Sequence, residues 1–166
     1  MSLYTLPHFE PINIDALDEY YDTEMMLNDK AIQIDLNFEN KSIAPEKMDQ
    51  VKNILAQLLQ LDQQNKTYIA NDFEDEDGDT VRTYVEHHLE EIGRDELAAF
   101  IDFNNANLTP EQQCMHHLHL VRLGLYPDSE DYFATFDYSL GKDLTDYLVV
   151  INIDAEGQLQ YLTMES

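Results

Sequence analysis

Apolar residues recur at every second position near both ends of the chain and at helical spacing in between, and this order constrains the fold most strongly. Residues 31–38 alternate apolar and polar side chains, which is typical of a strand with one buried face. Residues 19–27 are expected to pair with them antiparallel through a turn at Asn28-Asp29. An extended segment near residues 9–14 is expected to add an edge strand.

The middle of the chain is predicted to be helical. Pro45 suits a first helical position, and a broad apolar stripe follows it to Leu61. A second segment carries Tyr68 to Phe73, and Thr80 or Asp79 could cap a further helix that Gly93 would end. A shorter helix is expected near residues 97–101. Each stripe leaves one face polar, so each helix should pack on one side only.

The last third returns to strands, predicted at residues 118–126, 132–138, 147–153 and 159–164. The short turn-forming breaks between them favour antiparallel neighbours, because a parallel return needs a long crossover. We therefore expect one α+β domain covering residues 1–166. Its core would be a single antiparallel β-sheet, an N-terminal hairpin plus a C-terminal four-strand meander, with three or four helices packed on one face.

The charge is strongly unbalanced: 34 acidic residues face nine basic ones, giving −25 at neutral pH. Such a chain should repel nucleic acid and anionic membranes and attract basic protein surfaces. The acidity could equally serve solubility alone, and the two interpretations weigh about the same.

The compartment is expected to be the cytoplasm. Cys114 is the single cysteine, so no intramolecular disulfide can form. The N-terminus lacks the basic and apolar regions of a signal peptide, and no apolar run approaches the ~20 residues that span a bilayer.

The acidic run at residues 72–79 is one candidate for chemistry. Asp75, Asp77 and Gly78 match positions of a calcium-binding EF-hand loop, but Phe73 and Tyr84 stand where carboxylates are required. A looser divalent site remains open. A solvated loop whose charge favours the following helix is the stronger interpretation.

The histidines are a second candidate. His116, His117 and His119 follow Cys114 at the expected entrance to a strand, where His117 and His119 would share a face. They could bind zinc if a carboxylate or His88 approached, although the spacing matches no established zinc pattern. His88 lies on the apolar stripe of its expected helix, so we expect it to be a hydrogen-bonded core residue. Cys114 has no cationic surroundings that would activate it, so a small buried thiol is expected.

No nucleophile elbow, Walker loop or dinucleotide-binding fingerprint occurs, and only three arginines (Arg82, Arg94 and Arg122) could clamp a phosphate. We expect no cofactor and favour a protein that is not an enzyme.

Aromatic and acidic residues interleave in the last third. The rings are Tyr132, Phe133, Phe136, Tyr138 and Tyr147, and the acids are Asp128, Glu130, Asp131, Asp137, Asp143 and Asp146. This mixture suits a surface that docks a basic partner, with rings as anchors and acids for steering. About half of the rings are expected to belong to the core instead.

The same region carries a resemblance. The segments His119-Leu120-Val121-Arg122-Leu123-Gly124-Leu125-Tyr126-Pro127, Phe136-Asp137-Tyr138 and Asp146-Tyr147-Leu148-Val149-Val150 resemble an uncharacterised bacterial domain-of-unknown-function family of acidic α+β proteins. That resemblance implies the fold class and no catalytic residues. In size and composition the chain is also similar to immunity proteins, which neutralise toxin enzymes, although no specific motif is shared.

The sequence thus favours a non-enzymatic protein that binds a basic protein, such as an immunity protein acting on a cationic nuclease-type toxin. The partner-binding residues would be Asp75, Asp77, Asp131, Tyr132, Asp137 and Tyr138. An acidic mimic of nucleic acid differs from this only in its partner. The alternative is a metal-dependent hydrolase or metal-binding domain built on His117, His119 and a carboxylate.

Overall fold

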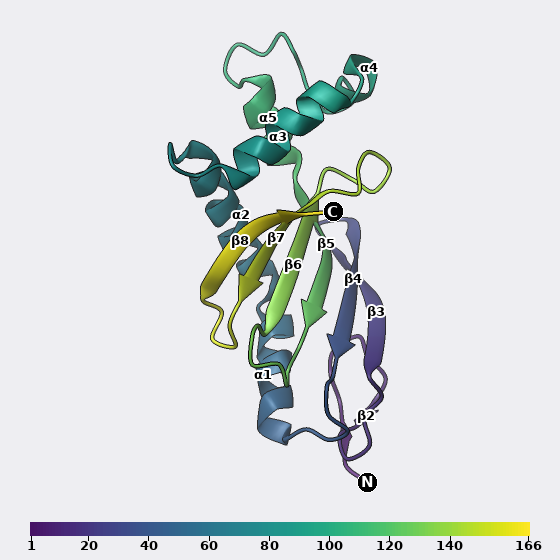
Figure 1. Ribbon diagram of the computed structural model, residues 1–166. Helices are drawn as coiled ribbons and strands as arrows, with labels where there is room; N and C mark the ends of the chain where they lie inside the picture. Colours follow the sequence, from purple (N-terminus) through teal and green to yellow (C-terminus); the bar gives the residue numbers. More distant parts are fainter.

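A computed structural model describes residues 1–166 and shows an α+β fold with a six-stranded mixed sheet, a two-stranded sheet and five helices (Figure 1). The large sheet has the strand order β3-β4-β5-β6-β7-β8. The predicted fold class is confirmed, whereas the layout of the sheet differs from the prediction in detail.

The N-terminal hairpin forms as predicted. Strands β3 (Tyr20–Leu27) and β4 (Lys30–Asn37) pair antiparallel over their full length. Asn28 and Asp29 connect them with φ angles of 50° and 66°. Positive φ at both central residues is what a tight hairpin turn needs, and Asn and Asp tolerate it better than most residues.

The C-terminal meander is also confirmed. Strands β5 (His119–Leu125), β6 (Ala134–Ser139), β7 (Leu148–Ile153) and β8 (Leu159–Glu165) follow one another antiparallel. In both the hairpin and the meander, short segments rich in turn-forming residues join the strands, and such segments can be recognised in the sequence.

The prediction of a fully antiparallel sheet is wrong where these two units meet. Strand β4 pairs parallel with β5, with Asp35 opposite Gly124 and Leu36 opposite Leu125. All five helices lie in the chain between these strands, and so long a crossover can return the chain to the same end of the sheet.

The expected edge strand near residues 9–14 does not join the large sheet. Strand β2 (Ile12–Asn13) instead pairs with β1 (Leu3–Tyr4) in a separate two-stranded sheet. Ile12 and Ile14 are buried there as part of the core.

The helices occupy two places. Helices α1 (Pro45–Ala56) and α2 (Leu58–Glu74) run behind the sheet, while α3 (Thr80–Glu91), α4 (Arg94–Leu97) and α5 (Pro110–His117) gather at one end of it (Figure 1). The apolar stripe that starts at Pro45 spans two helices, since α1 ends before Gln57 and the buried Leu58 and Leu61 belong to α2. Of the three or four helices expected on one face, α1 and α2 run behind the sheet, and the others lie at its end.

A single cluster of 35 buried residues fills the space between the helices and one face of the sheet. Alternate residues of the central strands supply it, including Ile34, Leu123, Phe136 and Ile151. The other face of the sheet therefore carries the intervening side chains, and no helix covers it (Figure 1).

Candidate binding surface on the open face of the sheet

The uncovered face of the sheet, here called the open face, is polar, acidic and partly aromatic. Strand β3 presents Tyr20, Asp22, Glu24 and Met26 to solvent, because these alternate residues are its exposed ones. Asp22 stands directly opposite Asp35 of β4, so both carboxylates lie on this face. The face continues across the sheet to β8 on the far edge.

Arg122 lies at the centre of the open face. Its Nε donates to Oδ1 of Asp35 at 2.7 Å and its Nη2 to Oδ2 of the same carboxylate at 2.8 Å. Its Nη1 donates to Oδ2 of Asp137 at 3.2 Å, and Nη2 also reaches the hydroxyl of Tyr126 at 3.0 Å. Burial alone would lower the pKa of Arg122, but the hydrogen bonds to Asp35 and Tyr126 hold it well above its ordinary value.

Gly124 makes this arrangement sterically possible. A Cβ atom at position 124 would stand 2.5 Å from Nη2 of Arg122 and 2.9 Å from its Cζ. The guanidinium therefore lies over the bare backbone of its own strand, two residues away, on its way to Asp35 of the neighbouring strand. A side chain here would have to displace a group pinned by two carboxylates.

Asp137 is a nearly buried acid of the open face. Its side chain is only 8% exposed, and burial raises its pKa. The Arg122 guanidinium opposes that rise, while Glu165 and Asp35 add to it. One guanidinium thus serves several neighbouring carboxylates, which leaves the surroundings of Asp137 negative overall.

Beside Arg122 and Asp137 the face opens into a hollow of about 310 Å³. Asn152 and Glu165 contribute polar groups to its lining, and Tyr126, Tyr132 and Tyr161 contribute aromatic rings. The rings of Tyr126 and Tyr132 meet edge to face, with centroids 4.6 Å apart. Tyr161 is 48% exposed, so part of this aromatic surface is open to solvent.

Three of the predicted partner-binding residues belong to this region. Asp137 and Tyr132 line the hollow, and the exposed Asp131 precedes Tyr132 in the loop between β5 and β6. Burial raises the pKa of Tyr132, and so do Tyr126, Tyr161 and Asp131.

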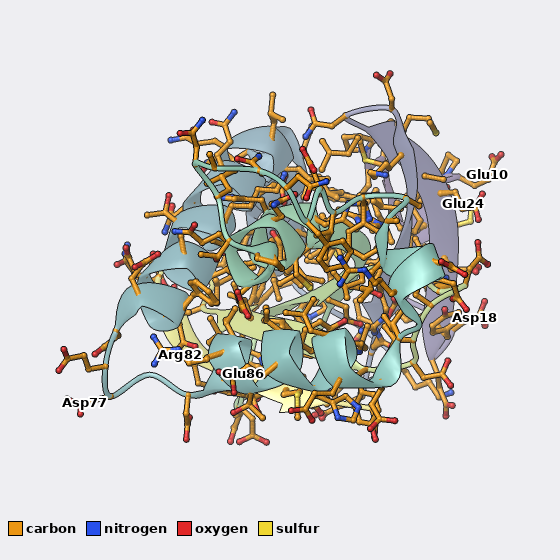
Figure 2. The ribbon with its side chains drawn as sticks, turned by 90° about the horizontal axis from the view of Figure 1, so that it is seen from above. Glu10, Asp18, Glu24, Asp77, Arg82 and Glu86 are labelled. Atoms are coloured by element: carbon orange, nitrogen blue, oxygen red, sulfur yellow. The ribbon has the colours of Figure 1, made fainter.

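Asp75 and Asp77 lie elsewhere, in the loop between α2 and α3. Figure 2 shows Asp77 projecting from one side of the molecule and Glu24 of the open face from another. Asp75 accepts the backbone N–H of Asp77 within the loop, at 3.0 Å. The charge that favours the start of α3 comes from Asp72, whose Oδ2 accepts the N–H of Val81 at 2.8 Å.

Tyr138 is not part of any surface in this structure. Its side chain is fully buried on the helix side of the sheet, where its hydroxyl donates to Asp62 of α2 at 2.7 Å. Tyr138 directly follows Asp137 in strand β6, and adjacent strand residues point to opposite faces. Tyr138 and Asp137 could not both contact one partner on the open face.

The histidine cluster differs from the prediction in its placement. Cys114, His116 and His117 lie in helix α5, and only His119 lies in the strand. The rings of His117 and His119 are still close, with centroids 5.8 Å apart. No group of three metal-ligating side chains forms anywhere in the structure, so the pair has no third ligand.

The expectations for His88 and Cys114 are confirmed. His88 is 2% exposed, with Nδ1 2.6 Å from the carbonyl oxygen of Tyr84 and Nε2 2.7 Å from the hydroxyl of Thr145. Because a carbonyl only accepts, Nδ1 carries the proton and Nε2 accepts from Thr145. Cys114 is fully buried, and burial raises the pKa of its thiol to about 12.

The centre of the face is not predictable from local sequence patterns. Asp35 and Arg122 are far apart in the sequence, and nothing in either segment indicates that they pair. An available signal was the arginine at position 122 between apolar neighbours, because a partly buried guanidinium needs carboxylate partners.

Comparison with known protein families, curated proteins and solved structures finds no match. None of the helices is both long and apolar enough to cross a bilayer.

Proposed function

We propose that this chain is a non-enzymatic binding protein and that its open face docks a basic protein. The observation that carries the proposal is the face itself: an uncovered sheet surface whose carboxylates outnumber its cations. Asp22, Glu24, Asp35, Asp137 and Glu165 lie on or border it, and Arg122 is already engaged by two of them.

The open face also carries exposed apolar surface that a partner could bury. Tyr20 is 49% exposed, Met26 61% and Tyr161 48%. Aromatic residues and methionine are enriched at the cores of protein interfaces, where they supply most of the binding energy. The carboxylates would steer a cationic partner toward them and fix its orientation.

A toxin enzyme with a cationic substrate site is the kind of partner that this chemistry suits, which agrees with the resemblance to immunity proteins. The carboxylates would occupy the positions where such an enzyme holds substrate phosphates, and inhibition would follow from occlusion. A nucleic-acid mimic works by the same physics, so the identity of the captured protein separates the two. Asp75 and Asp77 stay a prediction of a second contact.

The test starts with capture of partners on the purified chain from the cells that produce it, at low salt. The protein released by a salt gradient is then purified, and its affinity is measured by calorimetry between roughly 50 and 500 mM salt. A partner with a basic isoelectric point whose affinity falls steadily with salt supports the proposal. An acidic partner, or affinity unchanged across the series, contradicts it.

A further inference from the structure

We propose, building on the function proposed above, that the hollow beside Arg122 holds one lysine or arginine side chain of the basic partner. The hollow would take the terminal cation between Asp137 and Glu165 and the alkyl stem against the tyrosine rings.

One carboxylate oxygen in the hollow has no donor from the protein. The side chain of Asp137 is 8% exposed and lines the hollow. Arg122 engages its Oδ2 at 3.2 Å, and no donor of the protein engages its Oδ1. Oδ1 is open to solvent in the hollow, where an entering cation would replace water as its donor.

The hollow carries more negative than positive charge. Asp35 and Asp137 share the guanidinium of Arg122, Glu165 adds a carboxylate that pairs with no cation, and no lysine lines the hollow. The hollow excludes part of the solvent, so this excess of negative charge is screened less than on an open surface. An incoming cation is therefore attracted despite the presence of Arg122.

Tyrosine rings form one wall of the hollow. Tyr126 and Tyr132 stand edge to face, and Tyr161 adds a third ring. A ring face attracts an ammonium or guanidinium group, and more strongly when water is partly excluded. The same rings cover the methylene stem that leads to the cation.

Asn152 adds a hydrogen bond donor at the edge of this wall. It is 2% exposed and lines the hollow. Its Oδ1 accepts from the hydroxyl of Thr135 at 2.6 Å, while its Nδ2 donates to no atom of the protein. In the complex this amide would donate to a carbonyl oxygen of the partner backbone beside the inserted side chain.

The experiment uses small cations as probes, n-butylammonium and n-butylguanidinium, titrated into the full-length protein and followed by amide chemical shifts. We expect saturable shifts around Asp137, Asn152 and Tyr161, with millimolar affinity as befits so small a ligand. Neutral n-butanol, which has the same stem, should bind about tenfold more weakly or not at all.

Two variants make the test specific. Asp137→Asn keeps the shape and the hydrogen bond to Arg122 but removes the charge, and it should weaken cation binding about tenfold. Glu86→Gln, an exposed site on α3, removes one charge elsewhere and should leave it unchanged (Figure 2). Amide spectra of both variants show whether the fold is retained.

Cation binding that neither Asp137→Asn nor the loss of the probe's charge weakens would overturn the inference. So would the absence of saturable shifts in the hollow, even if a basic protein still binds the open face. That second result separates the two proposals, because the partner assay does not depend on the hollow alone.

Discussion

Arg122 and Asp35 form a two-pronged ion pair across the parallel junction between the N-terminal hairpin and the C-terminal meander. Nε and Nη2 of the guanidinium lie 2.7 and 2.8 Å from the two carboxylate oxygens. Strand β4, which carries Asp35, and strand β5, which carries Arg122, join the two parts of the sheet. The pair therefore links units that are separated in the sequence by all five helices.

Replacing Arg122 by Met should destabilise the fold by roughly 3–5 kcal/mol at neutral pH, because the nearly buried carboxylates of Asp35 and Asp137 would lose their counter-charge. Urea unfolding measures the loss. Arg94→Met is a matched control, since the exposed Arg94 lies over the ring of Phe103 rather than beside a carboxylate, and it should lose no more than about 1 kcal/mol. Equal losses of unfolding free energy in both variants would show that the ion pairs of Arg122 with Asp35 and Asp137 do not stabilise the sheet.

Adding a methyl group at Gly124 should destabilise the protein by about 1–3 kcal/mol, because it would meet the guanidinium of Arg122 at 2.5 Å. The conflict depends on Arg122. In the Arg122→Met background, Gly124→Ala should therefore have a much smaller effect, and a double-mutant cycle from urea unfolding gives the coupling. Strictly additive losses would mean that the two residues do not interfere.

Asp137 should make the stability of the protein depend on pH. Its pKa is raised in the folded state, so folding favours the protonated form, and the wild type gains stability as pH falls through that pKa. Asp137→Asn cannot take up this proton. The stability of the wild type minus that of the variant should therefore increase as pH is lowered from 7 toward 4, measured by urea unfolding at each pH.

Many other carboxylates titrate in the same range, so only this difference is informative. A difference that stays constant with pH, or that decreases on acidification, would contradict the raised pKa of Asp137.

The loop before β7 should depend on the hydrogen bond between Thr145 and His88. Thr145→Val removes the donor to the buried Nε2 of His88 together with the acceptor of the Tyr147 N–H, and it should destabilise the fold by about 1–3 kcal/mol. Thr67→Val, at an exposed helical position, serves as the control for the chemistry of the substitution. If thermal unfolding finds the two variants equally stable, the Thr145 hydroxyl does not contribute.

Local patterns predicted much of the fold. Asn28 and Asp29 marked the hairpin turn, and Pro45 marked the start of α1, because turn and helix-start chemistry resides in the residues themselves. The same logic could have found α5. Thr109 and Gln112 form a capping box, with Pro110 at the first helical position. These residues predict a helix start, whereas the histidines that follow were assigned to the entrance of a strand.

The centre of the site was beyond local patterns. The pairing of Asp35 with Arg122 depends on the register of β4 against β5, two strands that all five helices separate in the sequence. The prediction of the partner-binding residues overlooked the alternation of side chains along a strand. Asp137 and Tyr138 were both expected to meet the partner, although their adjacency in a strand places them on opposite faces.

The central claim is that the open face is the docking surface, and matched charge reversals test it most directly. One double variant, Asp22→Lys with Glu24→Lys, alters the open face, and the other, Glu86→Lys with Glu90→Lys, alters exposed positions of α3 by the same charge. Calorimetry with the captured basic partner should show at least a roughly tenfold loss of affinity for the first and little change for the second. Equal losses for both would mean that the partner responds only to overall charge, and the claim would be wrong.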